Sequence, residues 1–255
     1  MSIITTANRF VKELQLVSQI LPADQYYRWL SGIPFNLPTL IQRKSLNIID
    51  STFGHSFSIK WAKRQLKFDE LDFGVVREIY GHCCYAQPGD LKNARHILDL
   101  GANGGAFTLF ALVEAPQAQV HAVEVQADMA QVLQHNVQQN GCTDRLTMEI
   151  AVVGGFYNAW TQTQGQKNPD LKVFNIHDYI SRVSRCDFLK CDVEGGEFPL
   201  FQGDLSWIEA VDKMAIEYHT DWGSVDDLEE KLRTSGYHIC KADHGCLGYF
   251  YCSRV

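Results

Sequence analysis

The stretch from Arg95 to Gly105, RHILDLGANGG, constrains the fold of this chain more than any other. Its apolar run, His96 to Leu100, is short, ends in a glycine-rich turn and is followed by helical spacing from Ala106 onward. A run with these boundaries is typical of a parallel strand that is covered on both faces. The pattern therefore predicts an α/β fold in which strands and helices alternate.

The turn itself has the properties of a ligand site. Gly101 and Gly104 permit backbone angles that other residues avoid and let a ligand approach the chain closely. Asp99 stands at the carboxyl end of the strand, where open α/β sheets bind ligands. The dinucleotide motif GxGxxG is not met, because Asn103 replaces its second glycine. The turn suits a nucleoside with an amino-acid tail, and it resembles the first motif of class I S-adenosylmethionine (SAM) methyltransferases.

The next two strands are expected to line the same pocket. Residues 120–125, VHAVEV, predict a strand with Glu124 at its end, where the carboxylate can accept both hydroxyls of a ribose. Residues 145–153 predict a further strand, which ends where the edge of an adenine can meet backbone groups near Ala151. A plain strand–helix–strand unit with a tight turn is the alternative interpretation.

The segment before the glycine turn is a candidate for the other end of the ligand. Residues 71–80 predict a short helix that leads toward the turn. Glu78 on this helix and Tyr85 beyond it can reach the amino-acid end of the nucleoside. Surface residues on a linking helix would show the same pattern, so both interpretations stay open.

A second informative stretch, CDFLKCDVEGGEF, follows further along the chain. Residues 188–191 predict a strand, which in a doubly wound sheet lies beside the first one. Lys190 and Asp192 share a face because strand side chains alternate, and Glu194 and Glu197 follow in a glycine turn. Charges so close to a strand end are costly to desolvate unless they are paired or used. The cluster therefore predicts an active site, with an ion-paired rim as the alternative.

Later segments complete the predicted sheet. Residues 213–218, KMAIEY, predict a fifth strand that ends beside His219. Residues 237–241 and 247–252 predict a terminal hairpin, and the polar stretch 154–170 predicts a long loop that can serve a substrate. We expect a doubly wound, mostly parallel, seven-stranded Rossmann-like sheet with an antiparallel C-terminal hairpin.

The N-terminal part is expected to be an extension of that fold. Residues 3–21 carry apolar side chains at three- and four-residue intervals, which predicts an amphipathic helix. This helix packs on the domain, forms a homodimer contact or covers the substrate. The glycine and prolines within residues 30–39 predict irregular chain. Residues 46–53 and 57–61 predict a β-hairpin around Gly54.

Length and composition set the frame. A chain of 255 residues suits an extension, residues 1–70, followed by a SAM-binding domain, residues 71–255. The net charge of −7 and the absence of a lysine and arginine cluster disfavour nucleic acid as a partner. Eight cysteines without a CxxC pair, and no signal peptide, indicate reduced thiols in a cytoplasmic protein. No apolar run approaches the roughly 20 residues of a membrane span.

The two informative stretches together resemble the FkbM family of SAM-dependent methyltransferases. The resemblance rests on ILDLGANGG, on the pattern that runs from Lys190 through Asp192, Glu194 and Gly195 to Glu197, and on IEYH after it. It covers roughly residues 78–255. It implies methyl transfer from SAM, usually to an oxygen of a sugar or natural product, with a small hydroxylated molecule as the acceptor.

The catalytic roles follow from this chemistry. A hydroxyl is a poor nucleophile near neutral pH, so a positioned base is expected, and Asp192 and His219 are the candidates. An unperturbed histidine, with a pKa near ~6.5, can accept a proton at physiological pH. Lys190 is expected to pair with Glu217 or Glu194 and to hold the carboxylates in place. Alternatively, Asp192, Glu194 and His219 hold a divalent cation such as Mg²⁺.

Two functions of other classes fit parts of the pattern. An NAD-dependent oxidoreductase would use a similar sheet, although Asn103 argues against it. A non-catalytic module that binds SAM or a partner would keep the glycine turn, although the intact acidic cluster argues against that. SAM binding distinguishes the first alternative, and methyl transfer to any acceptor distinguishes the second.

Overall fold

A computed structural model describes residues 3–43 and 46–254. The chain forms two compact units. One comprises residues 1–84 together with 138–141, and the other comprises residues 85–137 and 142–255. The break along the chain therefore follows Cys84, whereas the sequence predicted it after residue 70.

The N-terminal unit is mostly helical and contains one antiparallel pair of strands, in which Phe57 pairs with Phe68. Its elements are α1 (Ile3–Ile20), α2 (Ala23–Arg43), α3 (Asn47–Phe53), β1 (Phe57–Trp61), β2 (Arg64–Phe68), α4 (Phe73–Val76) and the π-helical turn η1 (Arg77–Gly81). The predicted N-terminal helix is confirmed as α1.

Two predictions for this unit are wrong. The stretch expected to be irregular lies inside α2, which runs through Pro34 and Pro38. Trp29 and Leu40 on either side of the prolines are buried, so tertiary packing overrides the local preference of proline. The first strand of the expected hairpin is instead α3, which buries Ile49 and Phe53 on one face. The hairpin consists of β1 and β2.

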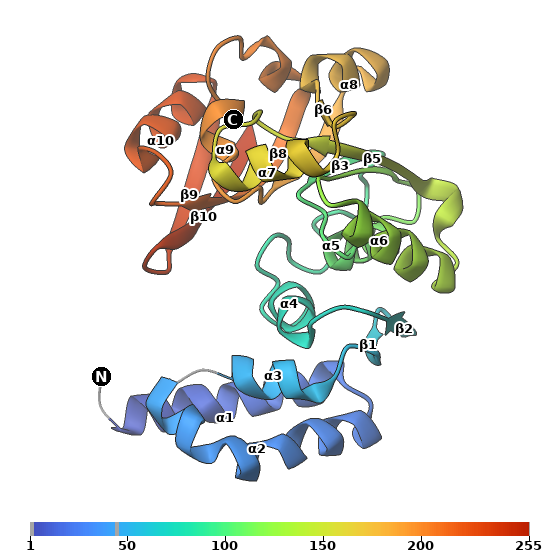
Figure 1. The fold of residues 1–255 in the computed structure, drawn as a ribbon, viewed down its shortest axis with the longest axis vertical. Helices are drawn as coiled ribbons and strands as arrows, with labels where there is room; N and C mark the ends of the chain where they lie inside the picture. Colours follow the sequence, from blue (N-terminus) through green and yellow to red (C-terminus); the bar gives the residue numbers. More distant parts are fainter. Residues whose placement is uncertain (1–2, 44–45, 255) are drawn as a thin grey trace. The chain divides into compact units, whose positions relative to one another are not determined.

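The larger unit is built on an eight-stranded sheet with the order β6-β5-β4-β3-β7-β8-β10-β9 (Figure 1). Neighbouring strands from β6 to β8 are parallel, and β10 runs antiparallel to both β8 and β9. The predicted fold class is confirmed. The sheet has one strand more than the seven that were predicted, and the additional strand is the two-residue β6. The strands are β3 (His96–Leu100), β4 (Gln119–Glu124), β5 (Leu146–Val152), β6 (Lys172–Val173), β7 (Cys186–Cys191), β8 (Val211–His219), β9 (Tyr237–Asp243) and β10 (Leu247–Arg254).

Helices connect these strands. The stretch 154–170, expected to be a loop, contains α7, whose N-terminus is capped by the side chain of Asn158. No helix among the described residues is long and apolar enough to cross a membrane. The helices are α5 (Ala106–Glu114), α6 (Ala127–Gln139), η2 (Thr143–Arg145), α7 (Ala159–Lys167), α8 (Ile176–Val183), α9 (Glu197–Leu200), η3 (Ser206–Ala210) and α10 (Val225–Thr234).

Each face of the sheet packs against its own buried core, and Asp99 and Lys190 lie on the same face. Leu98 and Leu100 belong to a large buried cluster that includes side chains of α8, α9 and α10. On the opposite face, Phe107 of α5 stacks on Phe188 of β7 with ring centroids 6.0 Å apart. Because alternate residues share a face, Asp99 of β3 lies on this second side, next in register to Lys190 of β7.

Candidate active site

The glycine turn after β3 is shaped by close backbone packing. Gly101 has a φ of +75°, and a Cβ atom there would lie 1.7 Å from the carbonyl oxygen of Asp192. Any side chain at this position would therefore separate the ends of β3 and β7. Asn103 also has a positive φ, 49°, and its side-chain oxygen accepts a hydrogen bond from the Gly104 amide at 2.6 Å. Asparagine tolerates this conformation better than most residues, which explains why it can replace a glycine here.

Glu124 at the end of β4 is bonded to the turn. One carboxylate oxygen accepts a hydrogen bond from the Asn103 amide at 2.8 Å, and the other accepts one from the Gln126 amide at 2.9 Å. Burial raises the pKa of Glu124, and these two backbone bonds oppose the increase. Each oxygen keeps a second lone pair for a ligand hydroxyl.

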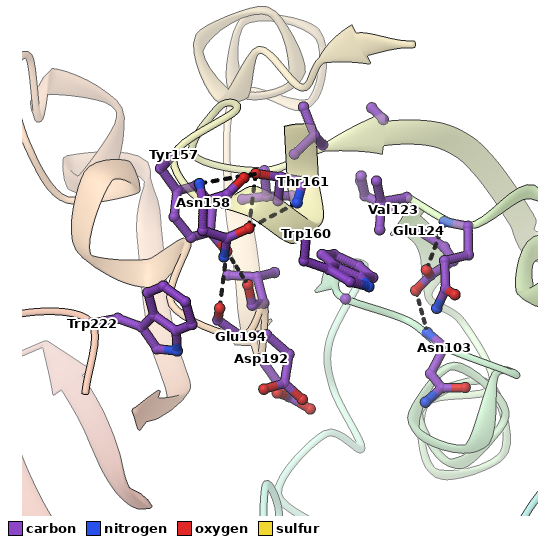
Figure 2. A pocket seen from close by; sticks show the side chains of 17 residues that line it. Asn103, Val123, Glu124, Tyr157, Asn158, Trp160, Thr161, Asp192, Glu194 and Trp222 are labelled. Atoms are coloured by element: carbon purple, nitrogen blue, oxygen red, sulfur yellow. Dashed lines mark hydrogen bonds between the residues drawn. The ribbon is translucent and has the colours of Figure 1, made fainter. Parts of the chain in front are cut away.

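A cavity of about 400 Å³ opens between the glycine turn, the ends of β4 and β5, and helix α7. In Figure 2, Glu124 and Asn103 lie at one end, while Glu194 and Trp222 lie at the other end with Asp192 near them. The structure thus brings to one cavity six of the predicted site residues, which are Gly101, Asn103, Glu124, Ala151, Asp192 and Glu194.

Other predicted site residues do not line this cavity. Asp99 is fully buried, where it accepts a hydrogen bond from Thr108 Oγ1 at 2.6 Å. The carbonyl oxygen of Gly104 accepts a bond from Asn136 Nδ2 at 2.9 Å, which ties the turn to α6. Both residues support the turn from behind. Glu78 belongs to the N-terminal unit, so its contact with the cofactor stays a prediction.

Lys190 is a buried cation at the centre of the site. Its Nζ lies 3.3 Å from Asp99 Oδ1 and 3.6 Å from Asp192 Oδ2, and it donates to the carbonyl of Gly101 at 2.5 Å. Burial by itself lowers the pKa of Lys190, but the charges of Asp99, Asp192 and Glu217 outweigh it and raise the pKa. The expected direct partners were Glu217 and Glu194. The structure instead pairs Lys190 with Asp99 and Asp192, because these flank it on the same sheet face.

Tyr85 connects two carboxyl groups that are far apart in sequence. Its hydroxyl lies 2.8 Å from Asp192 Oδ2 and 2.7 Å from Glu217 Oε2. The ring lies over the Lys190 ammonium at 5.2 Å and packs edge-on against Phe107. Tyr85 thus contacts the wall of the cavity through Asp192, and its predicted direct contact with the cofactor stays a prediction.

His219 does not have the pKa that the sequence suggested. Its Nδ1 lies 3.1 Å from Glu197 Oε1, and its Nε2 lies 3.3 Å from Glu194 Oε2. Burial lowers the pKa of His219, but the hydrogen bond to Glu197 and the charges of Glu197, Glu194 and Asp192 outweigh it and raise the pKa to about 9. The imidazole is therefore protonated near neutral pH, and the prediction of a histidine base with a pKa near ~6.5 is corrected.

Protonation of His219 also weakens the alternative prediction of a divalent-cation site. Ligand atoms of Asp192, Glu194 and His219 lie within 4.8 Å of one another. A doubly protonated imidazole has no lone pair for a metal, and here each ring nitrogen faces a carboxylate. The geometry therefore favours an ion-paired cluster, and a bound divalent cation stays a prediction.

Two features of the cavity were not expected from the sequence. Trp222, in the loop after β8, is 51% exposed and packs on Gly195, where a Cβ atom would lie 2.5 Å from the indole. The Tyr157 hydroxyl lies within hydrogen-bond distance of the carbonyl oxygens of Val193 and Glu194, at 2.8 and 3.0 Å. The glycine pair Gly195-Gly196 was the available sequence signal for the first contact, because glycines after a strand permit close packing, and Gly195 does take a positive φ.

Comparison with known proteins places this geometry in context. A family model described as "Methyltransferase FkbM domain" matches residues 99–239. The tRNA1(Val) (adenine(37)-N6)-methyltransferase of Shewanella loihica is 38% identical over 77 residues, which cover 30% of this chain and 31% of that protein's length. The fibrillarin pre-rRNA processing protein of Methanococcus jannaschii is 14% identical, with 78% of this chain and 82% of that chain covered and a TM-score of 0.50. The TrmK protein of M. capricolum, in complex with S-adenosylhomocysteine, has a TM-score of 0.41 at 12% identity, with 63% and 62% covered.

Proposed function

Because this chain belongs to the FkbM family of SAM-dependent methyltransferases, we propose that it methylates a hydroxyl oxygen of a sugar or another small ring compound. The family match includes both the glycine turn and the acidic cluster.

The residues at the Glu124 end of the cavity are suited to bind SAM. Glu124 offers a carboxylate for the ribose hydroxyls, Gly101 lines the same cavity, and Ala151 lines the side where an adenine edge would lie. The buried Oδ1 atom of Asp99 lies 3.3 Å from Lys190 Nζ, so an ion pair lies beneath the turn. A bound SAM supplies an electrophilic methyl group, which leaves binding, orientation and proton removal to the protein.

The acidic lining of the cavity is the main evidence for the class of acceptor. Asp192, Glu194 and Glu124 contribute carboxyl groups to its lining. Among the described residues that line the cavity, none is a lysine, arginine or histidine. A phosphate, sulfate or carboxylate on the acceptor would therefore meet carboxyl groups without a cationic side chain from the described lining. Uncharged or cationic acceptors fit this lining.

Two indole side chains indicate a ring on the acceptor. Trp160 is 42% exposed and Trp222 is 51% exposed, and both line the cavity. Indole faces favour the apolar face of a ring, with hydroxyls at its edge left for polar groups. Glu194 and Asp192 lie toward the Trp222 end of the cavity and can accept hydrogen bonds from such hydroxyls (Figure 2).

Asp192 is the residue best placed to remove the proton of the acceptor. It lines the cavity with a side chain that is 27% exposed, and Lys190 and Tyr85 hold its carboxylate from behind. A base held in this way can contribute roughly 10²–10⁴-fold to the rate. Protonated His219 fits a supporting role, in which it holds Glu194 at the rim.

A base in RNA is the second candidate acceptor, because the Shewanella loihica relative is named as a tRNA adenine methyltransferase. The matched segment is less than a third of that protein. The net charge of −7 and the acidic lining of the cavity oppose a polyanion, whose binding depends on cationic side chains at the phosphates.

One experiment separates these candidates. The protein would be incubated with methyl-labelled SAM and either a library of hydroxylated metabolites or total tRNA, and size filtration would separate small products from RNA. We expect label in the small-molecule fraction, with neutral glycosides and phenols labelled before phosphorylated compounds. Label in the RNA fraction would replace the proposal with the second candidate. The Asp192→Asn protein serves as the control for enzymatic transfer.

A further inference from the structure

Strands β1 and β2 form a short hairpin in the N-terminal unit (Figure 1), and its turn carries a concentration of positive charge. Residues 60–67, KWAKRQLK, contain four cations and no acid, although the chain as a whole has a net charge of −7. The side chains of Lys60, Lys63, Arg64 and Lys67 are all exposed. The expectation that the chain has no lysine and arginine cluster is therefore corrected for this segment, which we call the basic hairpin.

The described residues do not neutralise these cations. Their ion pairs involve other basic side chains, and none involves the basic hairpin. Asp69 and Glu70 follow the end of β2, where Phe68 pairs with Phe57, whereas the turn is at the other end of the strands. At roughly 3.3 Å per residue, these acids are about 20 Å along the chain from Lys63. The charge at the tip is therefore available to a partner.

The turn holds one of these cations in an unfavourable backbone conformation. Ala62 and Lys63 form a two-residue loop and have positive φ angles of 48° and 62°. Loops of this kind favour Asn-Gly, because asparagine and glycine tolerate left-handed angles that other residues avoid. Lys63 thus stands at the tip against the local conformational preference. Strain of this kind is a sign of function.

Protection of the strand edges does not explain the lysines. Exposed edge strands often carry lysine, which blocks pairing with strands of another molecule. In this hairpin both edges are already covered. Along β2, the Asn140 side chain accepts a hydrogen bond from the Lys67 amide at 3.0 Å and donates one to the Lys67 carbonyl at 2.8 Å. Along β1, the Ser58 amide donates to Gln25 Oε1 at 2.9 Å.

The composition of the hairpin surface distinguishes between classes of anionic partner. None of the large, exposed apolar side chains of the described residues belongs to residues 57–68. Trp61 packs edge-on against Tyr80, with ring centroids 5.2 Å apart, and Arg64 already donates to the carbonyl of Asn140 at 2.8 Å. Protein interfaces have an apolar centre, and single-stranded RNA is bound by stacking on aromatic side chains, so both fit poorly. A layer of lipid headgroups requires only exposed positive charge.

We propose that the basic hairpin docks this protein on an anionic membrane surface, with Lys60, Lys63 and Lys67 at the lipid phosphates. Each lysine or arginine near such a surface strengthens binding by about fivefold. Four cations therefore give a reversible, salt-sensitive attachment to the surface, without insertion of the chain into the bilayer. Docking of this kind is independent of the methyl acceptor.

Vesicle sedimentation with the full chain tests this docking. Vesicles of phosphatidylcholine alone are compared with vesicles of equal parts phosphatidylcholine and phosphatidylglycerol. We expect the protein to sediment only with the vesicles that contain phosphatidylglycerol. Raising the salt from about 0.1 M to about 1 M should release it, because the Debye length falls from about 10 Å to about 3 Å. Equal sedimentation with both kinds of vesicle, or with neither, would overturn the proposal.

Two triple variants locate the binding surface. Replacing the three lysines of the basic hairpin by glutamine should weaken binding to the phosphatidylglycerol vesicles by about a hundredfold, since three contributions of about fivefold are lost. The control has the same net charge but loses three exposed lysines of the larger unit, through Lys92→Gln, Lys172→Gln and Lys213→Gln. It should bind like the wild type. An equal loss in the two variants would show attraction without a defined surface and would refute the docking site.

A substitution in the turn separates the effect of charge from the effect of folding. Ala62→Asn together with Lys63→Gly relieves the left-handed strain and removes one cation. Tm should therefore rise while binding to phosphatidylglycerol vesicles falls about fivefold. A protein that is more stable and yet binds less has not lost binding through unfolding. Unchanged vesicle binding in this variant would contradict the proposal.

Total tRNA is the probe for the other class of polyanion. Retention of tRNA by the wild type on a filter, without sedimentation with vesicles, would replace the membrane by RNA and overturn the proposal. These measurements use neither SAM nor an acceptor. A wrong acceptor class under the proposed function therefore leaves the result on the basic hairpin intact.

Discussion

Each of the two units contains a buried charge cluster, and the two clusters are satisfied in different ways. In the N-terminal unit, Asp50 accepts a hydrogen bond from Trp29 Nε1 at 2.9 Å and two from the Arg77 guanidinium at 3.0 and 2.8 Å. Glu13 takes a further Arg77 nitrogen at 2.9 Å. In the larger unit, Lys190 lies among several carboxyl groups, and Asp99 Oδ1 lacks a hydrogen bond.

The difference indicates what each cluster is for. The guanidinium of Arg77 has planar donors that match the carboxylates around it, and the cluster joins α1, α2, α3 and η1 within their unit. The cluster around Lys190 has more acids than bases, is linked to Glu217 through Tyr85 and reaches a cavity at Asp192. A buried ion network is a sign of function when its charges are incompletely matched beside open space. The first network therefore predicts effects on stability, and the second predicts effects on chemistry.

The largest expected effect is on turnover. Asp192→Asn keeps the size of the side chain and its contact with Tyr85, but the amide cannot accept the acceptor proton. Once an acceptor is known, kcat should fall by roughly 10²–10⁴-fold, with a much smaller change in SAM affinity measured by calorimetry. A loss confined to the transition state is the sign of a general base. Turnover equal to the wild type would make this cluster structural, like the one around Arg77.

The next largest effect is on folding of the N-terminal unit. Arg77→Met removes the partner of Asp50 and leaves a buried carboxylate without its counter-charge. Such a change costs roughly 3–5 kcal/mol in the free energy of unfolding, measurable by urea denaturation. Arg185→Met, which breaks an exposed pair with Asp212, is the matched control and should leave the free energy of unfolding nearly unchanged. Equal effects of the two substitutions would contradict the structural role of the Arg77 cluster.

A smaller effect is expected at the cofactor end. Glu124→Ala removes the acceptor of the Asn103 amide, which is also the proposed acceptor for the ribose hydroxyls. SAM affinity should fall by about 1–3 kcal/mol, the cost of a buried polar group left without a partner. Calorimetry with Glu124→Gln, which keeps one acceptor oxygen, should give an intermediate value. Unchanged SAM affinity in Glu124→Ala would remove this residue from the cofactor site.

The smallest predicted effect concerns His219 and pH. Its pKa is raised from 6.5 to about 9 in the folded protein, so the folded state binds the extra proton more tightly than the unfolded chain. The resulting stabilisation is fully present below pH 6.5 and is lost as the pH rises through 9. We expect His219→Gln to lower the free energy of unfolding by roughly 1–2 kcal/mol at pH 6.5 and by less at pH 9.5. A constant difference across this range would contradict the protonated imidazole.

Much of the larger unit was predictable because its signals are local. The short apolar run before Gly101 identified the central strand, and strand alternation placed Lys190 and Asp192 on one face. Glycines at positions of positive φ marked the turns that form the cavity wall. The predicted strand at 46–53 is wrong because the apolar residues of this segment fit either period. Only packing selects the helix that presents Asp50 to Trp29 and Arg77.

The sequence alone therefore determined the sheet, the cofactor turn and the identity of the acidic cluster, since each depends on residues close together in the chain. The tertiary structure decided which of those charged and polar groups meet. Tyr85 and Glu217 are 132 positions apart, and the contact between them exists only after the sheet has formed. The same is true of Glu197 and His219, whose contact changes the histidine from an expected base to a cation. A pKa depends on burial and on charges within a few ångströms, and these are properties of the fold.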